Sequence, residues 1–374
     1  MMTQVLCVAG ARPNFMKIAP IMAAFAEAGI AVQLLHTGQH YDAAMSDGFF
    51  ADLGIPPPDH HLEVGSASHA VQTAEVMKRF EPVLETVRPQ AVLVVGDVNS
   101  TLACALVAAK RGVRVIHVEA GLRSYDRGMP EEINRVLTDQ ISDLLFTTER
   151  SAEANLVREG VDRTRVHFVG NVMIDTLYRN LEQAVPSGVT LGTTLMQYAV
   201  LTLHRPSNVD HQQTLAALLD VVAELNRRLP VVLPLHPRTR ANIDKFGLAD
   251  KLEGMHVLPP VGYLEMLGLM RDARAVLTDS GGIQEETTAL GVPCLTLREN
   301  TERPITIDEG TNTLVGTDPV AIRAALDLVL HGAGKAGRIP EYWDGRAATR
   351  IAHTVKDWLP PQQGTHRISA LKVA

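Results

Sequence analysis

The sequence predicts an α/β protein of two doubly wound, Rossmann-like domains that face each other across a cleft. Short apolar runs alternate with helical patterns through most of the chain, which is typical of βαβ units and a parallel sheet. This scheme occurs twice, and 374 residues exceed the roughly 100 to 200 residues of one usual domain. Because open α/β sheets bind ligands beyond the carboxyl ends of their strands, both sheets are expected to present those ends to one cleft.

Candidate strands of the first half lie at residues 4–9, 32–36, 91–95, 114–118, 144–147 and 166–169. Helical patterns between them include residues 18–28 and 101–110. Candidate strands of the second half lie at residues 198–203, 231–235, 255–258, 275–278 and 294–297, with a weaker one at 314–316.

The stretch between the two halves contains Pro186, Gly188 and Gly192, which favour a linker. We therefore predict a first domain at 1–180, a second domain at 181–343 and a terminal segment at 344–374. The terminal segment has a helical pattern at 344–358, which is expected to pack back toward the first domain, and then a polar tail.

Composition limits the classes of partner. With 46% hydrophobic and 21% charged residues, the chain has the composition of a soluble globular protein. A formal net charge of −7 argues against a broad nucleic-acid surface or an anionic membrane partner. Cys7, Cys104 and Cys294 stand singly in apolar strings, which favours buried reduced thiols. No apolar run approaches the ~18 residues of a membrane helix, and no secretory signal is evident, so we expect a cytoplasmic protein.

The most informative stretch is Asp-Ser-Gly-Gly-Ile-Gln-Glu-Glu at 279–286, which follows a candidate strand and opens a helix. Gly281 and Gly282 let a ligand oxygen approach the backbone, and the free N–H groups from Ser280 onward attract anions. Glu286 lies one helical turn beyond Gly282, where its carboxylate suits a diol such as ribose. The stretch predicts a nucleotide clamp. The alternative is a serine-capped helix whose acids favour the positive end of its dipole.

Two cations follow the first strand. Arg12 and Lys17 lie at the start of a helix and suit a diphosphate, although a capped turn with solvated charges is the alternative. The turn is neither a Walker loop nor GxGxxG, which disfavours ATP hydrolysis and the usual dinucleotide site. Arg303, after the strand at 294–297, supplies another cation near the expected phosphate position.

Acids and imidazoles follow other strands. Asp97 and Glu119 come directly after the strands at 91–95 and 114–118. Glu131 lies in the first turn of a further helix, where it could equally serve the helix dipole. A lone histidine is more often structural, but His204 and His236 end two consecutive strands in the same way, which favours a place at the cleft.

A required metal or cofactor is not expected. The sequence has no HExxH, no paired CxxC and no EF-hand loop. The pair His60-His61 is expected in a Pro-rich loop with no matching ligand partner.

The motifs, taken in order, resemble the bacterial non-hydrolysing UDP-N-acetylglucosamine 2-epimerase family along nearly the whole chain. They are Gly-Ala-Arg-Pro at 10–13, Gly-Gln-His at 38–40, Gly-Asp at 96–97, His-Val-Glu-Ala-Gly-Leu-Arg at 117–123, Pro-Glu-Glu at 130–132, Gly-Asn at 170–171, His-Arg at 204–205, the stretch 279–286, Thr-Glu-Arg-Pro at 301–304 and Val-Gly-Thr-Asp at 315–318.

The resemblance implies a fold like that of the GT-B glycosyltransferases and the interconversion of UDP-GlcNAc with UDP-ManNAc. It implies catalytic roles for Asp97, Glu119, Glu131 and His204. It also implies that UDP is bound by Arg12, Lys17, Ser280, Gly281, Gly282, Glu286 and Arg303, and His236 is expected at the same site. A homodimer is what the family suggests, and UDP-GlcNAc acts as an allosteric activator of some relatives.

The chemistry fits the residues present. The C2 proton of a hexosamine is not acidic, so inversion at C2 needs either transient oxidation or elimination. Oxidation would require a nicotinamide, whose fingerprint is absent from the sequence. Elimination needs a base near C2 and stabilisation of departing UDP, and it gives a glycal to which UDP re-adds. The hypothesis is that Asp97, Glu119 and Glu131 transfer protons while His204 assists at the leaving phosphate.

Several alternatives stay open. Gly-Ala-Arg-Pro-Asn at 10–14 and Pro-Ser-Asn at 206–208 depart from the Gly-Thr-Arg-Pro-Glu and Arg-Glu of many members. The first departure leaves open a related UDP-2,3-diacetamido uronic acid as substrate. A GT-B glycosyltransferase would share the cleft and the clamp but would need only one base. A hydrolysing 2-epimerase and a non-catalytic nucleotide-sugar sensor are further alternatives.

Overall fold

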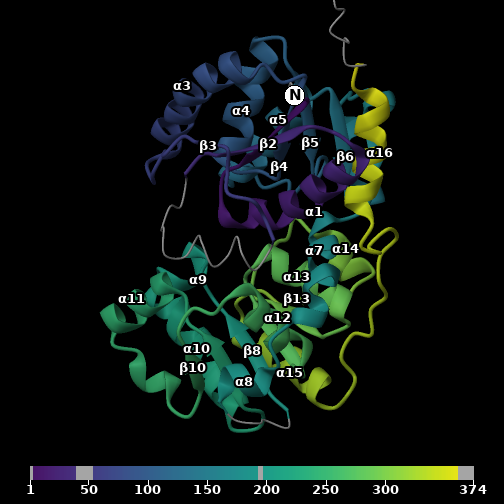
Figure 1. Cartoon of the computed structure of the whole chain (residues 1–374). Coiled ribbons are helices and arrows are strands. Elements are labelled where there is room, and N and C mark those ends of the chain that lie inside the picture. The colour runs from purple at the N-terminus through teal and green to yellow at the C-terminus, as the bar shows by residue number, and fades with distance from the viewer. Residues whose placement is uncertain (1–2, 39–53, 193–196, 361–374) are drawn as a thin grey trace, which may run out of the picture.

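Two parallel β-sheets, one in each half of the chain, form the framework of the protein (Figure 1). The structure is a computed structural model that describes residues 3–38, 54–192 and 197–360, together with all their side chains except that of Arg12. The first sheet has the order β3-β2-β1-β4-β5-β6-β7, and the second has the order β10-β9-β8-β11-β12-β13.

The strands of the first sheet are β1 (Val5–Ala9), β2 (Val32–His36), β3 (His60–His61), β4 (Ala91–Val95), β5 (Arg114–Val118), β6 (Leu144–Thr147) and β7 (Val166–Phe168). The strands of the second sheet are β8 (Ala199–Thr202), β9 (Val231–Pro234), β10 (His256–Leu258), β11 (Ala275–Thr278), β12 (Cys294–Thr296) and β13 (Asn312–Leu314).

The α-helices are α1 (Arg12–Ala28), α3 (His69–Val87), α4 (Asn99–Lys110), α5 (Pro130–Ile141), α6 (Arg150–Arg158), α7 (Val172–Asn180), α8 (Ser187–Leu191), α9 (Pro206–Val209), α10 (Gln212–Asn226), α11 (Pro237–Phe246), α12 (Tyr263–Arg271), α13 (Gly281–Leu290), α14 (Pro304–Asp308), α15 (Pro319–Leu330) and α16 (Ala347–Trp358). Short 3₁₀ turns are Arg163–Arg165, Leu181–Gln183 and Ala249–Leu252.

Each sheet reverses its strand order once, and these reversals set the position of the site. In the first sheet the chain winds outward from β1 to β3 and then returns to build β4 to β7 on the other side. The second sheet repeats this arrangement with its reversal between β8 and β11. Ligands of open α/β sheets bind at such reversals, beyond the carboxyl ends of the strands. The candidate residues that follow β1, β4, β8 and β11 therefore lie at the expected places.

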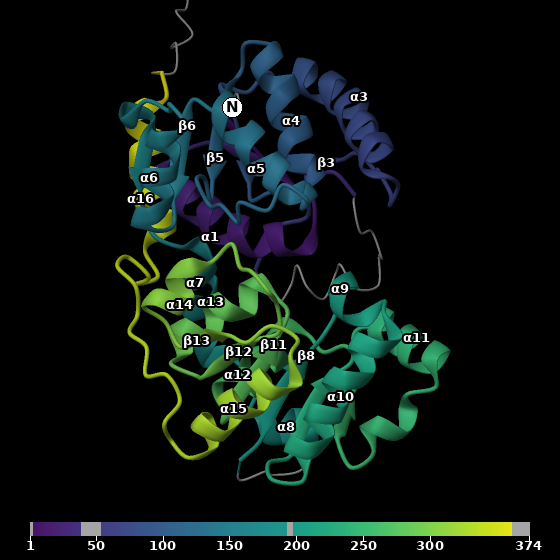
Figure 2. The same cartoon turned by 180° about the vertical axis from the view of Figure 1, so that it is seen from behind.

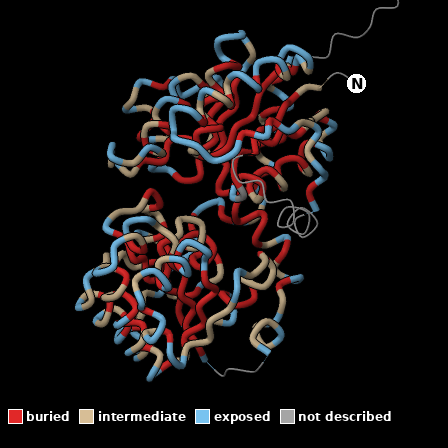
Figure 3. Tube along the Cα trace, turned by 90° about the vertical axis from the view of Figure 1, so that its left-hand side faces the viewer, coloured by how far each residue is buried: buried red, intermediate tan, exposed pale blue. Residues whose placement is uncertain are grey.

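The central strands are buried on both faces, which explains why they appear in the sequence as continuous apolar runs. All residues of β1, β4, β6 and β11 are buried. Figure 3 shows the buried residues concentrated along the strands at the centre of each half. One apolar cluster extends from the first sheet through α1, α7 and α16 to Tyr263 and Ala289 of the second half, so the two halves share part of a core.

The final helix α16 returns to the first half and lies beside α1 (Figure 2). Trp343, in the segment that leads to it, is 1% exposed. The carboxylate of Asp175 on α7 accepts hydrogen bonds from the backbone N–H groups of Ala347 and Ala348, at 3.1 and 2.7 Å. These bonds supply two of the partners that the first turn of a helix lacks, so Asp175 fixes where α16 begins.

Several local predictions from sequence differ from the structure. The weaker strand predicted at 314–316 is β13 at Asn312–Leu314, and Gly316 has a left-handed φ of 64°. Helix α1 begins at Arg12 rather than at 18, because Pro13 suits a first helical turn and Asn14 Oδ1 accepts hydrogen bonds from the N–H groups of Gly10 and Ala11. The terminal helix begins at Ala347 rather than at 344, after Gly345 with a left-handed φ of 74°. His60 and His61 form an edge strand paired with β2, where a loop was predicted.

Other sequence predictions concern single residues or whole segments. The three cysteines are buried and unpaired. Residues 193–196 of the predicted linker, the polar tail predicted from Gln362 and Gln39-His40 of the second motif lie outside the described residues. Within the described ranges, no helix combines the length and the apolar character that crossing a membrane requires.

Removing the Asp175 carboxylate should loosen α16. Asp175→Ala leaves two buried N–H groups without partners, and loss of a helix cap costs about 1–2 kcal/mol. Urea denaturation followed by tryptophan fluorescence is expected to show the earliest transition at lower urea, because Trp343 reports on this segment. Asp318→Ala removes the exposed cap of α15 and is the matched control. An unchanged first transition in Asp175→Ala would contradict the role given to this carboxylate.

Candidate active site

A cavity of about 330 Å³ lies between the two halves, at the carboxyl ends of β8 and β9. Pro13 and Met16 of α1 line one side of it. The other side comes from the second half and consists of Thr202, Leu203, His204, Pro234, His236, Pro260, Val261, Gly262, Tyr263, Met266, Ser280 and Ile283. The wall is mostly apolar with a few polar groups that converge, as is usual for the site of a small organic ligand.

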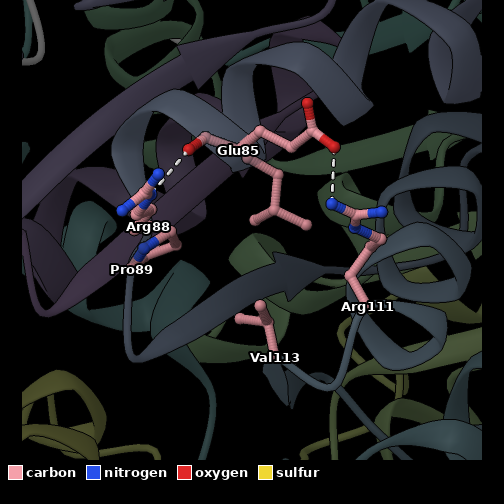
Figure 4. Close-up of a pocket in the computed structure, with 6 residues that line it drawn as sticks. Glu85, Arg88, Pro89, Arg111 and Val113 are labelled. Carbon is pink, nitrogen blue, oxygen red and sulfur yellow. Dashed lines mark hydrogen bonds and ion pairs between the residues drawn. The ribbon is translucent and has the colours of Figure 1, made fainter.

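A second cavity, of about 430 Å³, lies at the opposite edge of the first sheet, beside the amino ends of β4 and β5 (Figure 4). Two of its charged residues, Arg111 and Glu85, are about half exposed and form an ion pair. Arg111 Nη2 lies 2.5 Å from Glu85 Oε1, and Arg88 Nε donates to the carbonyl of Glu85. None of the predicted site residues lies in it, so we place the candidate site at the cavity between the halves.

His204 is held by a buried carboxylate. Its Nδ1 lies 2.7 Å from Asp279 Oδ1, and its backbone N–H also donates to Asp279. Burial alone raises the pKa of Asp279, but the hydrogen bonds and the charge of His204 outweigh this and lower the pKa below its usual range. The Asp279 carboxylate therefore stays ionised and orients the ring of His204, whose Nε2 remains available to a ligand.

His236 lies beside His204, with a distance of 5.7 Å between the ring centroids. Its Nδ1 accepts a hydrogen bond from the backbone N–H of Arg238 and so caps α11. Burial, and next the neighbouring His204, lower the pKa of His236. A neutral His236 whose Nδ1 is an acceptor carries its proton on Nε2, which makes it a hydrogen-bond donor toward the cavity.

The predicted clamp is the amino-terminal turn of α13. Ser280 precedes the helix, Gly281 and Gly282 begin it, and all three are only partly buried. The Ser280 side chain does not cap the helix, so the first N–H groups of α13 are open to an anion. Further along, burial raises the pKa of Glu286 to about 7, and its carboxylate faces Tyr263 without a hydrogen bond of regular geometry.

Glu119 follows β5 and is buried between two cations from different halves. Its Oε2 pairs with Lys17 Nζ of α1, and its Oε1 lies 3.4 Å from Arg303 Nη2. Burial by itself raises the pKa of Glu119, but Lys17 and Arg303 outweigh this and lower it. Its backbone is left-handed, with φ 68°, which costs a residue with a side chain about 1–2 kcal/mol. Such strain is often found at functional sites.

The loops that carry Asp97 and Glu119 are joined by His117. The two ring nitrogens of His117 lie 2.9 Å from the Gly96 carbonyl and 2.7 Å from Asp139 Oδ1. Asp139 Oδ2 in turn accepts a hydrogen bond from the N–H of Gly121. This network fixes the ends of β4 and β5 relative to each other, so the two acids are held in a defined arrangement.

Helix α5 carries Glu131 in its first turn and contacts Asp97 through Arg135. Asp97 Oδ2 is 2.7 Å from Arg135 Nη1, and its side chain is 28% exposed. Glu131 lies one turn before Arg135, on the same face of α5, and is partly buried. The neighbouring Glu132 has a structural role, because it accepts hydrogen bonds from the N–H groups of Ser124 and Tyr125. The two adjacent glutamates thus differ in their contacts.

Arg303, predicted as a phosphate ligand, is 7% exposed and already lies between two glutamates, Glu119 and Glu285. Lys17, predicted for the same role, pairs with Glu119. The side chain of Arg12 lies outside the described part of the structure. The structure thus brings Lys17, Glu119 and Arg303 together, and it groups His204, His236 and Ser280 around the cavity.

Sequence reasoning missed several partners of these residues. Asp279 could have been found, because β11 pairs with β8 in register from Ala275 with Ala199 to Thr278 with Thr202, which places Asp279 beside the end of the His204 strand. Arg135 and Glu285 carry no such signal, because each reads as an ordinary charged residue of a helix and its partner is remote in sequence.

Two doubly wound sheets that face each other across a ligand cavity define the GT-B-like class of proteins. The family model described as UDP-N-acetylglucosamine 2-epimerase matches residues 23–356. The chain therefore belongs to the non-hydrolysing UDP-N-acetylglucosamine 2-epimerase family, whose members are isomerases.

Individual relatives agree with this assignment. A UDP-N-acetylglucosamine 2-epimerase of Methanococcus maripaludis is 41% identical over 349 residues, which is 88% of this chain and 95% of that protein. A UDP-2,3-diacetamido-2,3-dideoxy-D-glucuronate 2-epimerase of Pseudomonas aeruginosa is 42% identical over 362 residues, which is 93% and 98%. The Methanocaldococcus jannaschii UDP-GlcNAc 2-epimerase in complex with UDP-GlcNAc and UDP superimposes with a TM-score of 0.88 at 39% identity, covering 95% of this chain and 99% of that one.

A methyl group at Gly282 should weaken UDP binding without weakening the fold. An added Cβ there meets only Met173 Cε, at 3.8 Å, and φ is not left-handed, so Gly282→Ala fits the helix. If phosphate oxygens approach this turn, the methyl obstructs them and the Kd for UDP should rise about tenfold, or ~1.4 kcal/mol. Calorimetry checks this, with Gly65→Ala, which meets no atom within 4 Å, as the control. An unchanged Kd would place the phosphates elsewhere.

Proposed function

We propose that this protein interconverts UDP-GlcNAc and UDP-ManNAc by eliminating UDP and adding it back after inversion at C2. The observation that carries the proposal is that the two halves bring different kinds of group to the carboxyl ends of their strands. The second half contributes a cavity with an open helix start and two oriented imidazoles. The first half contributes acids at the ends of β4 and β5.

The proposed reaction has a forward elimination and a return addition. A carboxylate takes the C2 proton, the electron pair of that C–H bond forms the C1–C2 double bond, and the C1–O bond breaks with its pair leaving on UDP. A second acid then delivers a proton to the opposite face of C2, and a phosphate oxygen of UDP re-forms the bond to C1. The elimination needs a positioned base and stabilisation of the leaving diphosphate.

We assign the proton transfers to Asp97, Glu119 and Glu131. Asp97 is more exposed than Glu119, because its side chain is 28% exposed against 2% for Glu119, and its contact with Arg135 uses one carboxylate oxygen. Because His204 donates its Nδ1–H to Asp279, its Nε2 carries a proton only in the imidazolium form, and this form is proposed to donate from Nε2 to the leaving phosphate. His236, Ser280, Gly281, Gly282 and Glu286 are proposed to bind UDP, with Arg12, Lys17 and Arg303 near its phosphates.

The relationship to the Pseudomonas aeruginosa enzyme supports a second candidate substrate. That relative is a UDP-2,3-diacetamido-2,3-dideoxy-D-glucuronate 2-epimerase, and it is as similar to this chain as the archaeal relatives are. Both substrates would undergo the same inversion at C2. Comparing kcat/KM for the two UDP-sugars decides between them. A homodimer and activation by UDP-GlcNAc stay predictions from the family resemblance.

Turnover in D₂O should place deuterium at C2. Incubating the protein with UDP-GlcNAc alone and following the reaction by ¹H NMR is expected to give UDP-ManNAc, with loss of the C2 proton signal from substrate and product as they equilibrate. A glycosyltransferase would leave UDP-GlcNAc largely intact, and a hydrolysing enzyme would release free ManNAc. An epimer formed with its C2 proton retained would contradict elimination.

Asp97→Asn should abolish most of the activity while leaving the site assembled. The amide keeps the size of the side chain and can still accept a hydrogen bond from Arg135, but it cannot take a proton. Loss of a general base lowers kcat by roughly 10²- to 10⁴-fold, while the Kd for UDP should stay unchanged. Asp220→Asn, at the exposed partner of Lys251, is the control. Full activity in Asp97→Asn would remove Asp97 from the proton-transfer set.

A further inference from the structure

We propose that Glu285 is a positioning residue that acts as the second ionic partner of Arg303, which also pairs with Glu119 across the interface between the two halves. Its described contacts are with Asn171 and Arg303, and not with the cavity. The effect on catalysis rests on the proposed function, in which Glu119 transfers a proton.

The contacts form one continuous path. Glu285 Oε1 lies 2.7 Å from Arg303 Nε and accepts a hydrogen bond of 2.9 Å from Asn171 Nδ2. At the other end of the guanidinium, Arg303 Nη2 lies 3.4 Å from Glu119 Oε1. Asn171 is itself fixed, because its Oδ1 caps α7 by accepting from the N–H of Met173. The path therefore runs from Asn171, the residue that precedes α7, through Glu285 and Arg303 of the second half to Glu119.

The energetics of burial favour a functional reason for Glu285. It is 1% exposed, its Oε2 has no hydrogen-bond partner in the described part of the chain, and the rise in its pKa that burial causes is opposed by Arg303. A buried ion pair commonly repays little more than the cost of removing both charges from water. Stability alone is therefore a weak explanation for a second carboxylate on Arg303.

A second carboxylate on Arg303 has a definite effect on Glu119. Arg303 forms ion pairs with two carboxylates, and without Glu285 the one that remains is Glu119, which also pairs with Lys17. The proton affinity of Glu119 would then be lower. With Glu285, two cations face two carboxylates, and Glu119 remains a stronger base. Other charges act on the same ion pairs. Glu286 lies beside Glu285, and Glu149, Glu302 and Asp97 act on Arg303.

The test is Glu285→Gln, which keeps the shape and the hydrogen bond from Asn171 but removes the charge. Arg303 then interacts more strongly with Glu119, which lowers the pKa of Glu119 and makes it a weaker base. The kcat should therefore fall about tenfold with little change in KM, and the acidic limb of the pH–rate profile should move to lower pH. A merely structural role would not move that limb. Glu224→Gln, which breaks the exposed pair with Arg323, is the matched control and should leave kcat, KM and the profile unchanged.

A second variant keeps the test decisive if Glu285→Gln folds poorly. Asn171→Ser retains a side chain that can cap α7 but is too short to reach Glu285. Because the hydrogen bond from Asn171 lowers the pKa of Glu285, its loss should favour the protonated form and shift the profile in the same direction by less. If the folded variants leave both kcat and the acidic limb unchanged, the proposal is wrong.

A readout without substrate separates this inference from the proposed function. Carboxyl ¹³C NMR of glutamate-labelled protein, with Glu119→Gln to assign the signal, follows the titration of Glu119 in the wild type and in Glu285→Gln. The proposal predicts a lower pKa for Glu119 in the variant, and an equal or higher pKa overturns it. A wild type that does not act on UDP-GlcNAc would refute the proposed substrate while leaving this comparison valid.

Discussion

The arrangement of the cleft depends on keeping one carboxylate charged inside the protein. Glu119 is buried where the two halves meet, and it can stay ionised there only because a cation from each half lies against it. Lys17 reaches it from α1, which follows β1, and Arg303 reaches it from the loop after β12. The paired strand reversals of the two sheets bring these segments to one place.

The two halves present groups of different chemical character at the carboxyl ends of their strands. In the second half, α13 follows a buried strand and leaves its first N–H groups open, while Asp279 at the end of that strand holds His204. In the first half, the residues after β4 and β5 include the carboxylates Asp97 and Glu119, and His117 and Asp139 join the loops that carry them. An elimination from a nucleotide sugar requires groups that bind the diphosphate and groups that move protons.

Much of the fold could be predicted because a strand buried on both faces is apolar along its whole length. The runs at 91–95 and 114–118 correspond to β4 and β5 without a shift. The start of α1 could not be found from periodicity, since it depends on the Asn14 side chain bonding to the preceding turn. The edge strand at His60 has only two residues and exists through its pairing with β2.

The site was predictable to the level of strand ends and no further. The positions of Asp97 and His204 follow from the rule that ligands bind beyond the carboxyl ends of parallel strands. The pairing of Arg303 with Glu119 joins residues 184 positions apart, and nothing local distinguishes a cation that contacts a ligand from one that balances an acid. Ionic partners at such separations are fixed by the packing of the two halves.

The central claim is that the C1–O bond breaks and that UDP stays in the cleft until it is added back. UDP-GlcNAc labelled with ¹⁸O in the bond between C1 and the β-phosphorus tests it, with ³¹P NMR to follow the label. After the C1–O bond breaks, UDP stays bound in the cleft and its terminal β-phosphate group can rotate. The account therefore predicts that the label spreads into the non-bridging β-phosphate oxygens during turnover. A label that stays in the bridge while the epimer accumulates would contradict elimination.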